Sequence, residues 1–191
     1  FYNLVDTIIV GRCLGVDALA AVGATGSVNF LVIGFCNGIC SGFAIPVAQR
    51  FGAQDDADLR RYVANSAILS IAFSIILAII VVIFCRPILT LMQTPENIID
   101  WSYDYIVIIF AGIPFTFLYN LTSGIIRSMG DSKAPVYFLL LASFLNIVLD
   151  LVLIMNFHMG VAGASIATVI SQAVSGICCL LYMRRYPLLC M

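Results

Sequence analysis

Two aspartates lie inside strongly apolar stretches of this 191-residue chain, where ionisable side chains are rare. Asp6 lies within Asn3–Val10, and Asp150 lies within Asn146–Leu153. A charged group at the centre of a bilayer costs at least about 2.5–3.5 kcal/mol, so it is generally retained for a function. If these stretches cross a membrane, both aspartates are candidates for binding a cation.

The chemistry available to such a pair is the reversible binding of a proton or a sodium ion. Burial in a low-dielectric pocket disfavours an ionised carboxylate, and a second carboxylate nearby disfavours it further. Hydroxyl and amide oxygens around the pair would complete the shell of a bound Na⁺. A change of occupant changes the charge of the pocket, and we expect that change to bend a helix. The competing interpretation is that Asp6 caps a helix or hydrogen-bonds locally near the interface.

Helical geometry predicts further polar side chains at the depth of these aspartates. At the rise of an α-helix, Asp6 lies about 9 Å below its outer turn. Asp150, Thr168 and Tyr105 lie about as far from the outer turns of their own helices. Asn146 lies one turn deeper than Asp150, on the same helix face. The sequence therefore predicts a polar site at one depth, to which four helices contribute.

The composition fits a chain whose solvent is lipid. Hydrophobic residues make up 62% of the chain, charged residues only 10%, and the mean hydropathy is +1.10. Soluble domains carry about 25% charged residues. The net charge of −1 provides no basic surface for nucleic acid. Seven cysteines without a CxxC pair and a single histidine argue against zinc and a disulfide framework, and we expect no cofactor.

Several apolar runs reach the length of about 20 residues that is needed to cross a hydrocarbon core. Short polar segments separate them, so we predict an all-α membrane protein, a six-transmembrane-helix bundle over residues 1–191. The chain opens directly in apolar sequence, so we interpret the first helix as truncated and the chain as a fragment. The predicted helices cover residues 1–12, 18–51, 59–85, 98–128, 135–155 and 162–183.

The distribution of basic residues predicts the orientation in the membrane. Cytoplasmic loops of membrane proteins carry an excess of Lys and Arg. The loops after the second, fourth and sixth helices carry seven such residues, whereas the other loops carry two. We therefore expect the first group of loops to be cytoplasmic, in a multi-pass protein of the cytoplasmic membrane. The two groups are Arg50, Arg60, Arg61, Arg127, Lys133, Arg184 and Arg185, against Arg12 and Arg86.

Two patterns concern helix packing and helix shape. Gly34, Gly38 and Gly42 recur every four residues and form a small-residue stripe that lets another helix approach closely. Pro46 and Pro114 each remove a backbone donor and favour a kink. Transporters use such breaks, and many static bundles contain them too.

Several segments in a fixed order carry a resemblance to a known family. The segments are Asn3–Asp6 followed by Val10–Gly11, Leu19–Gly23, Val47–Ala53, Arg127–Pro135, Leu145–Asn146 with Asp150, and Gly163–Thr168. Each segment is a weak match alone, but together they cover nearly the whole chain, and their order and spacing resemble the multidrug and toxic compound extrusion (MATE) family of antiporters.

The resemblance implies a protein of twelve helices in two lobes, of which this chain is the first, with the second contributed by the same polypeptide. It also implies export of small molecules, often cationic and aromatic, in exchange for H⁺ or Na⁺, and no metal other than Na⁺. Carried over residue by residue, the cation site falls on Asp6, Asn146, Asp150 and Thr168, and the cavity lining on Tyr105 and Asn120.

Three alternatives differ from a drug antiporter in activity. A lipid-linked oligosaccharide flippase of the same superfamily tends to line its cavity with several basic residues, and no Lys or Arg is expected mid-span here. An intramembrane aspartyl protease would need Asp104 and Asp131 to meet, but the predicted topology places them on opposite sides. A membrane protein without transport activity is the third. We therefore expect a cation-coupled antiporter and not an enzyme.

Overall fold

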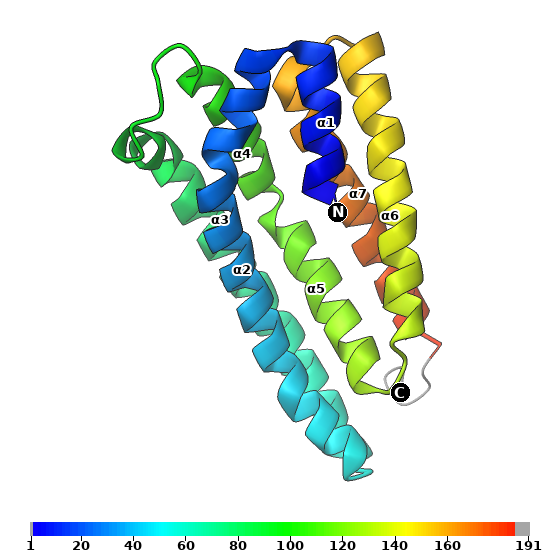
Figure 1. Cartoon of the computed structure of the whole chain (residues 1–191). Coiled ribbons are helices and arrows are strands. Elements are labelled where there is room, and N and C mark those ends of the chain that lie inside the picture. The colour runs from blue at the N-terminus through cyan, green and yellow to red at the C-terminus, as the bar shows by residue number, and fades with distance from the viewer. Residues whose placement is uncertain (1, 186–191) are drawn as a thin grey trace.

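All secondary-structure elements among the residues that the structure describes are helices, joined by short loops (Figure 1). A computed structural model describes residues 2–185, with side chains from Thr7 onwards. The predicted all-α class is therefore confirmed. The elements are α1 Tyr2–Leu14, α2 Val16–Gly52, α3 Asp56–Leu91, α4 Ile99–Ala111, α5 Ile113–Ser128, α6 Lys133–Leu151, the π-helical turn η1 Val152–Asn156, and α7 Gly160–Met183.

Four of these segments are long and apolar enough to cross a membrane: α2, α3, α6 continued by η1, and α7. Together α4 and α5 pass the same test as one broken span with a bend of 44°, which gives up to five candidate spans. Within the described residues α1 has 13, fewer than a full crossing needs. Because the spans expose most of their apolar surface, lipid or another protein surface must cover it.

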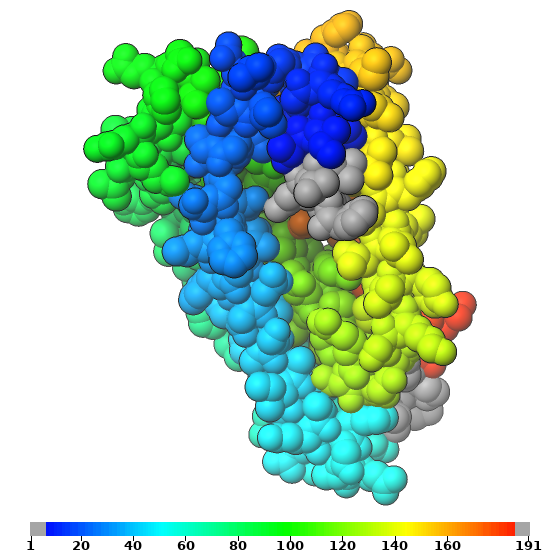
Figure 2. Space-filling model, in the orientation of Figure 1, coloured from blue at the N-terminus to red at the C-terminus, as the bar shows by residue number. Residues whose placement is uncertain are grey.

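The helices pack around α5 and α7, which occupy the middle of the bundle (Figure 1). On one side α5 contacts α2 and α3, and on the other it contacts α7, which in turn packs on α4 and α6. The α1 helix lies against α2, α6 and α7. In the face shown in Figure 2, α5 is visible between α2 and α6. The packed centre of the bundle therefore borders a face on which α5 is uncovered.

The predicted fourth helix, 98–128, is wrong as a single element, because it divides at Gly112 into α4 and α5. Pro114 falls in the first turn of α5, where a helix does not need the missing N–H group. By contrast, α2 continues through Pro46 as one helix. The predicted end of the third helix near Cys85 is also wrong, since α3 runs through Pro87 to Leu91.

The glycine stripe of α2 does not pack against another helix of the described chain. A methyl group placed at Gly34, Gly38 or Gly42 would meet nothing within 4 Å. The close approaches lie instead at Gly112, where it would come 2.5 Å from Val169 Cγ2, and at Gly176, where it would come 3.0 Å from Leu118. Small residues thus bring α7 close to the α4–α5 break.

The Gly112→Ala substitution tests this packing, with Gly38→Ala as the matched control. At Gly112 the new methyl must displace Val169, so we expect a loss of about 1–3 kcal/mol of stability. At Gly38 there is open space, so alanine should leave stability unchanged or raise it by up to about 1 kcal/mol through helix propensity. Thermal unfolding of the full-length protein in detergent measures both. Equal stabilisation by the two alanines would contradict the close contact of α7 with Gly112.

Candidate functional site

The interface between α6 and α7 contains a direct contact between two buried polar side chains. Asn146 of α6 donates its Nδ2–H to Thr168 Oγ1 of α7 over 3.3 Å. Thr168 donates its own hydroxyl to the carbonyl oxygen of Ala164, one turn earlier on α7, over 3.1 Å. Asn146 is 1% exposed and Thr168 is 8% exposed. Two of the four residues predicted for the cation site are therefore in contact.

Asp150 lies one helical turn after Asn146 on α6 and is fully buried, with 0% exposure. Immediately beyond it, α6 changes to the π-helical turn η1. Such local changes of helix type are frequent at functional sites. The third predicted residue thus lies next to the Asn146–Thr168 contact, on the same helix face. Asp6 belongs to α1, which packs on both α6 and α7, but its side chain lies outside the part of the chain that the structure describes.

These residues supply oxygen ligands from three chemical groups: a carboxylate, an amide and a hydroxyl. Such a set suits a proton or a hard, weakly charged cation such as Na⁺. Within residues 7–185, no three His, Cys, Asp or Glu side chains come together in a way that would hold a metal ion. The ligand set present at this site is therefore one of oxygen atoms from a carboxylate, an amide and a hydroxyl.

Thr168 also lines a cavity of about 210 Å³ between α2, α4 and α7. Tyr105 of α4, which is 5% exposed, and Gln172 of α7 line the same cavity, together with Asn29 and Asn37 of α2. The predicted cavity residue Tyr105 therefore shares a space with Thr168, one of the residues predicted for the cation site. Polar side chains from three helices thus extend the site toward α2.

The polar lining continues along α2 and α5 through two further spaces. A cavity of about 160 Å³ contains Asn37, Asn120, Thr116 and Gln172, and the Thr116 hydroxyl donates to Gln172 Oε1. Asn37 and Asn120 also line a groove of about 600 Å³ that extends to Arg127. Because neighbouring spaces share residues, they form a row of polar side chains from Thr168 toward the loop after α5.

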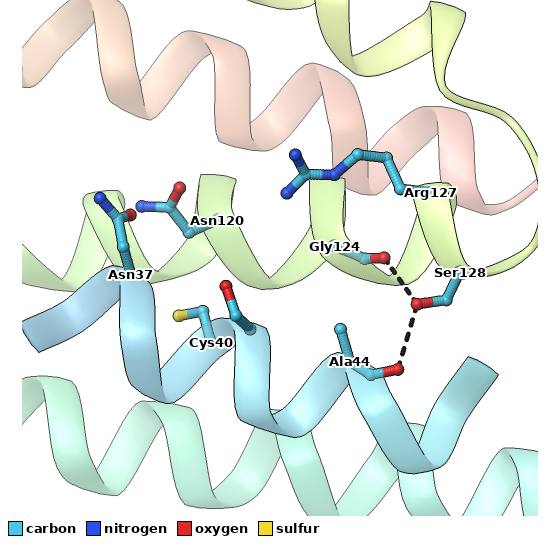
Figure 3. Close-up of a pocket in the computed structure, with 8 residues that line it drawn as sticks. Asn37, Cys40, Ala44, Asn120, Gly124, Arg127 and Ser128 are labelled. Carbon is cyan, nitrogen blue, oxygen red and sulfur yellow. Dashed lines mark hydrogen bonds between the residues drawn. The ribbon is translucent and has the colours of Figure 1, made fainter. Parts of the chain in front are cut away.

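Figure 3 shows Asn37 and Asn120 pointing toward one another across this groove, with Arg127 further along α5. Ser128 donates its hydroxyl to the carbonyl oxygens of Ala44 over 3.1 Å and Gly124 over 2.9 Å, which joins α5 to α2 at the far end. Arg127 is the one charged side chain among the described residues that line the three spaces. The predicted cavity residue Asn120 therefore faces a polar groove with one basic group.

Among the lining residues that were not predicted for the site, three connect the spaces or carry a charge: Asn37, Gln172 and Arg127. The predicted loop began at Arg127, but the residue belongs to the last turn of α5. A pattern in the sequence would have identified the other two. Gln172 follows Thr168 by four residues, and Asn37 follows Asn29 by eight, so each pair lies on one helix face.

The comparisons with known proteins agree with this fold. Residues 1–152 match the MatE family. The probable multidrug resistance protein YoeA of Bacillus subtilis is 39% identical over 187 residues, which cover 96% of this chain and 40% of that protein. YpnP, a probable multidrug resistance protein of the same organism, is 31% identical and is covered over 42% of its length. A crystal structure of MATE in the bent conformation superposes with a TM-score of 0.91 at 30% identity, over 98% of this chain and 42% of that one.

The fold and the family match define a multi-pass helical membrane protein of the transporter class. The chain belongs to the MatE family, which confirms the resemblance seen in the sequence. It spans about two fifths of the length of the curated relatives that it matches. The family therefore follows from the comparisons, whereas the activity of the whole protein is a matter of inference.

Thr168→Val tests the contact between α6 and α7, with Thr90→Val as the matched control. Valine preserves the shape of the side chain but leaves the buried amide of Asn146 without its acceptor, so we expect a loss of about 1–2 kcal/mol. The hydroxyl of Thr90 is exposed and donates to the carbonyl oxygen of Arg86 over 3.0 Å, so its loss should have little effect. Unfolding of the full-length protein in detergent gives both values. Equal effects at the two positions would argue against the buried contact.

Proposed function

We propose that this chain is the first lobe of a cation-coupled antiporter that exports drugs, toxic organic cations or metabolites across the cytoplasmic membrane. The observation that carries the proposal is the buried set of Asn146, Asp150 and Thr168 at one end of a row of polar side chains. Burial of an ionisable carboxylate inside a membrane bundle is expensive and is typical of proton and ion pathways. Asp6 of α1 would complete this cation site.

In this proposal, the coupling ion and the substrate use neighbouring but separate spaces. H⁺ or Na⁺ binds at Asp150 and its partners, and the substrate binds in the polar groove along α2 and α5. Binding of a cation neutralises the negative charge of Asp150 between α6 and α7. This changes the electrostatic interactions that hold the two helices together. Thr168 bonds to Asn146 and lines the cavity of about 210 Å³. That cavity shares Asn37 and Gln172 with the groove, so a shift of α7 would reach the groove and release the substrate outward.

The groove supports a substrate with both apolar and polar groups. Tyr105 offers an aromatic ring, while Asn37, Asn120 and Gln172 offer amide groups that accept as well as donate hydrogen bonds. An aromatic face attracts organic cations, which fits the cationic, aromatic compounds that the family resemblance implies. Arg127 at the far end favours substrates whose positive charge lies near Tyr105.

A flippase for lipid-linked oligosaccharides is the second candidate, and Arg127 is the observation that favours it. A guanidinium group in a polar groove suits the phosphate of such a lipid. However, the described lining contains this one basic residue, whereas an anionic pyrophosphate would be held better by several. We therefore retain drug or metabolite export as the proposed function.

The proposed lobe consists of six spans, with the bent α4–α5 pair as one and α1 as the described part of another. The remaining length of the relatives would supply a second lobe of the same polypeptide. We propose that this second lobe faces the side on which α5 is uncovered between α2 and α6 (Figure 2).

Asp150→Asn tests the cation site, because it preserves the shape of the side chain and removes the group that gains and loses a proton. We expect ethidium efflux by the full-length protein, driven by a pH or Na⁺ gradient, to fall close to background. Asp104→Asn is the matched control, since it removes an exposed carboxylate from α4 and should leave efflux unchanged. Coupled efflux by Asp150→Asn at the level of the unmodified protein would rule out the proposed role of Asp150.

The proposed orientation places the α3–α4 loop outside and the α2–α3 loop in the cytoplasm. In a background without the native cysteines, a cysteine at Asn97 should be labelled by an impermeant maleimide added to intact cells. A cysteine at Ala53 should react only after the cells are opened, because Arg50, Arg60 and Arg61 hold its side of the protein in the cytoplasm. Labelling in the opposite pattern would reverse the topology.

A further inference from the structure

A second open groove lies between α6 and α7, near the point where α6 begins and α7 ends (Figure 1). Its volume is about 680 Å³, and it contains none of the residues assigned to the cation site or to the polar groove. Part of its lining is apolar and includes Phe138, Cys178 and Leu181. Leu181 is exposed, so this part of the groove is open to whatever surrounds the bundle.

The polar base of this groove is held in a fixed arrangement. Asp131 Oδ1 accepts hydrogen bonds from the backbone N–H groups of Lys133 and Ala134, each over 3.1 Å. Its other oxygen, Oδ2, accepts the hydroxyl proton of Tyr182 over 2.7 Å. The Tyr182 ring packs edge-on against Phe138 with the centroids 5.7 Å apart. Both oxygens of the carboxylate therefore already accept hydrogen bonds from within the protein.

Two basic side chains border the same groove without an ion pair within residues 7–185. Lys133 is exposed at the start of α6. Arg185 lies just beyond α7 with its guanidinium carbon 5.6 Å from the centre of the Tyr182 ring. The salt bridges of the described chain involve other arginines, namely Arg50, Arg61 and Arg86. The groove therefore presents two cationic groups and one engaged carboxylate below an apolar cleft.

We propose that this groove binds the headgroup of an anionic phospholipid. The phosphate would lie between Lys133 and Arg185, and the acyl chains would follow the cleft past Phe138 and Leu181. Basic pockets between transmembrane helices at the cytoplasmic surface are suited to anionic lipid headgroups. Tyr137 and Tyr182 also line the groove and have the amphipathic character of side chains at a membrane interface.

The features of the groove favour a lipid over a soluble anion. A free phosphate would use the two cations but would leave the apolar cleft uncovered, whereas a phospholipid satisfies both parts of the site at once. The groove is also separate from the polar row along α2 and α5, so its occupant does not have to be the transported compound. The proposal rests on the membrane location of the chain and on the proposed cytoplasmic side of the groove, and it does not depend on transport.

The experiment uses full-length protein stripped of lipid in detergent and titrated with phosphatidylglycerol or phosphatidylcholine, with bound lipid measured by native mass spectrometry. We expect phosphatidylglycerol to be retained in preference to phosphatidylcholine. Lys133→Gln with Arg185→Gln should weaken phosphatidylglycerol retention roughly 30-fold, since each basic group near an anionic headgroup contributes about fivefold. The charge-conserving pair Lys133→Arg with Arg185→Lys should retain most of the binding.

Arg60→Gln with Arg61→Gln is the matched control, because it removes two charges from the same predicted side of the membrane but outside the groove. This control should keep the preference for phosphatidylglycerol. The proposal is overturned if the Lys133/Arg185 double glutamine variant binds phosphatidylglycerol as tightly as the unmodified protein, or if the control loses binding equally. Equal retention of phosphatidylcholine, or displacement of phosphatidylglycerol by millimolar inorganic phosphate, would also overturn it.

Discussion

The requirement that polar groups inside a bilayer find their partners within the protein governs this structure. Lipid offers no hydrogen bonds, so the amide of Asn146 and the hydroxyl of Thr168 bond to each other and to the backbone. Their contact fixes α6 against α7, the most buried of the candidate spans. The other face of α7 is held by close approaches at Gly112 and Gly176, where a side chain would not fit. One helix therefore connects a polar contact on one side with small-residue packing on the other.

Much of the fold could be predicted from the sequence, because span length and hydrophobicity are set by the bilayer. Helix interruptions were harder to predict, since they depend on tertiary contacts. The break at Gly112 lies two residues before Pro114, where the sequence favours a kink, but the close approach of Val169 to Gly112 could not be predicted from the residues around it. Pro87 appeared to end α3, yet the helix continues, and the hydroxyl of Thr90 bonds to the Arg86 carbonyl in that turn. Proline alone did not distinguish a helix end from a helix interior.

Site residues whose burial is costly, such as charged side chains, could be predicted from the sequence. Site residues whose burial costs less, such as uncharged amides, could not. An aspartate in an apolar run is conspicuous, so Asp150 and its neighbour Asn146 were identified from sequence, and the structure buries both. Amides such as Asn37 and Gln172 carry no charge, so their position in a span indicates little until the cavities around them are known. Asp6 remains a prediction, since its side chain lies outside the described residues. Its helix, α1, packs against both α6 and α7.

The geometry limits how the two proposed sites can communicate. Coupling requires an element that touches both sites and has two alternative positions. Among the described helices, α7 meets the first condition, because Thr168 bonds to Asn146 and Gln172 accepts from Thr116 in the groove. The second condition, two alternative positions, would be met through the π-helical turn η1. An i→i+5 turn can convert to an α-turn and shift the residues beyond it. A cation that alters the charge beside η1 would therefore act first on the α6–α7 pair and only through it on the groove.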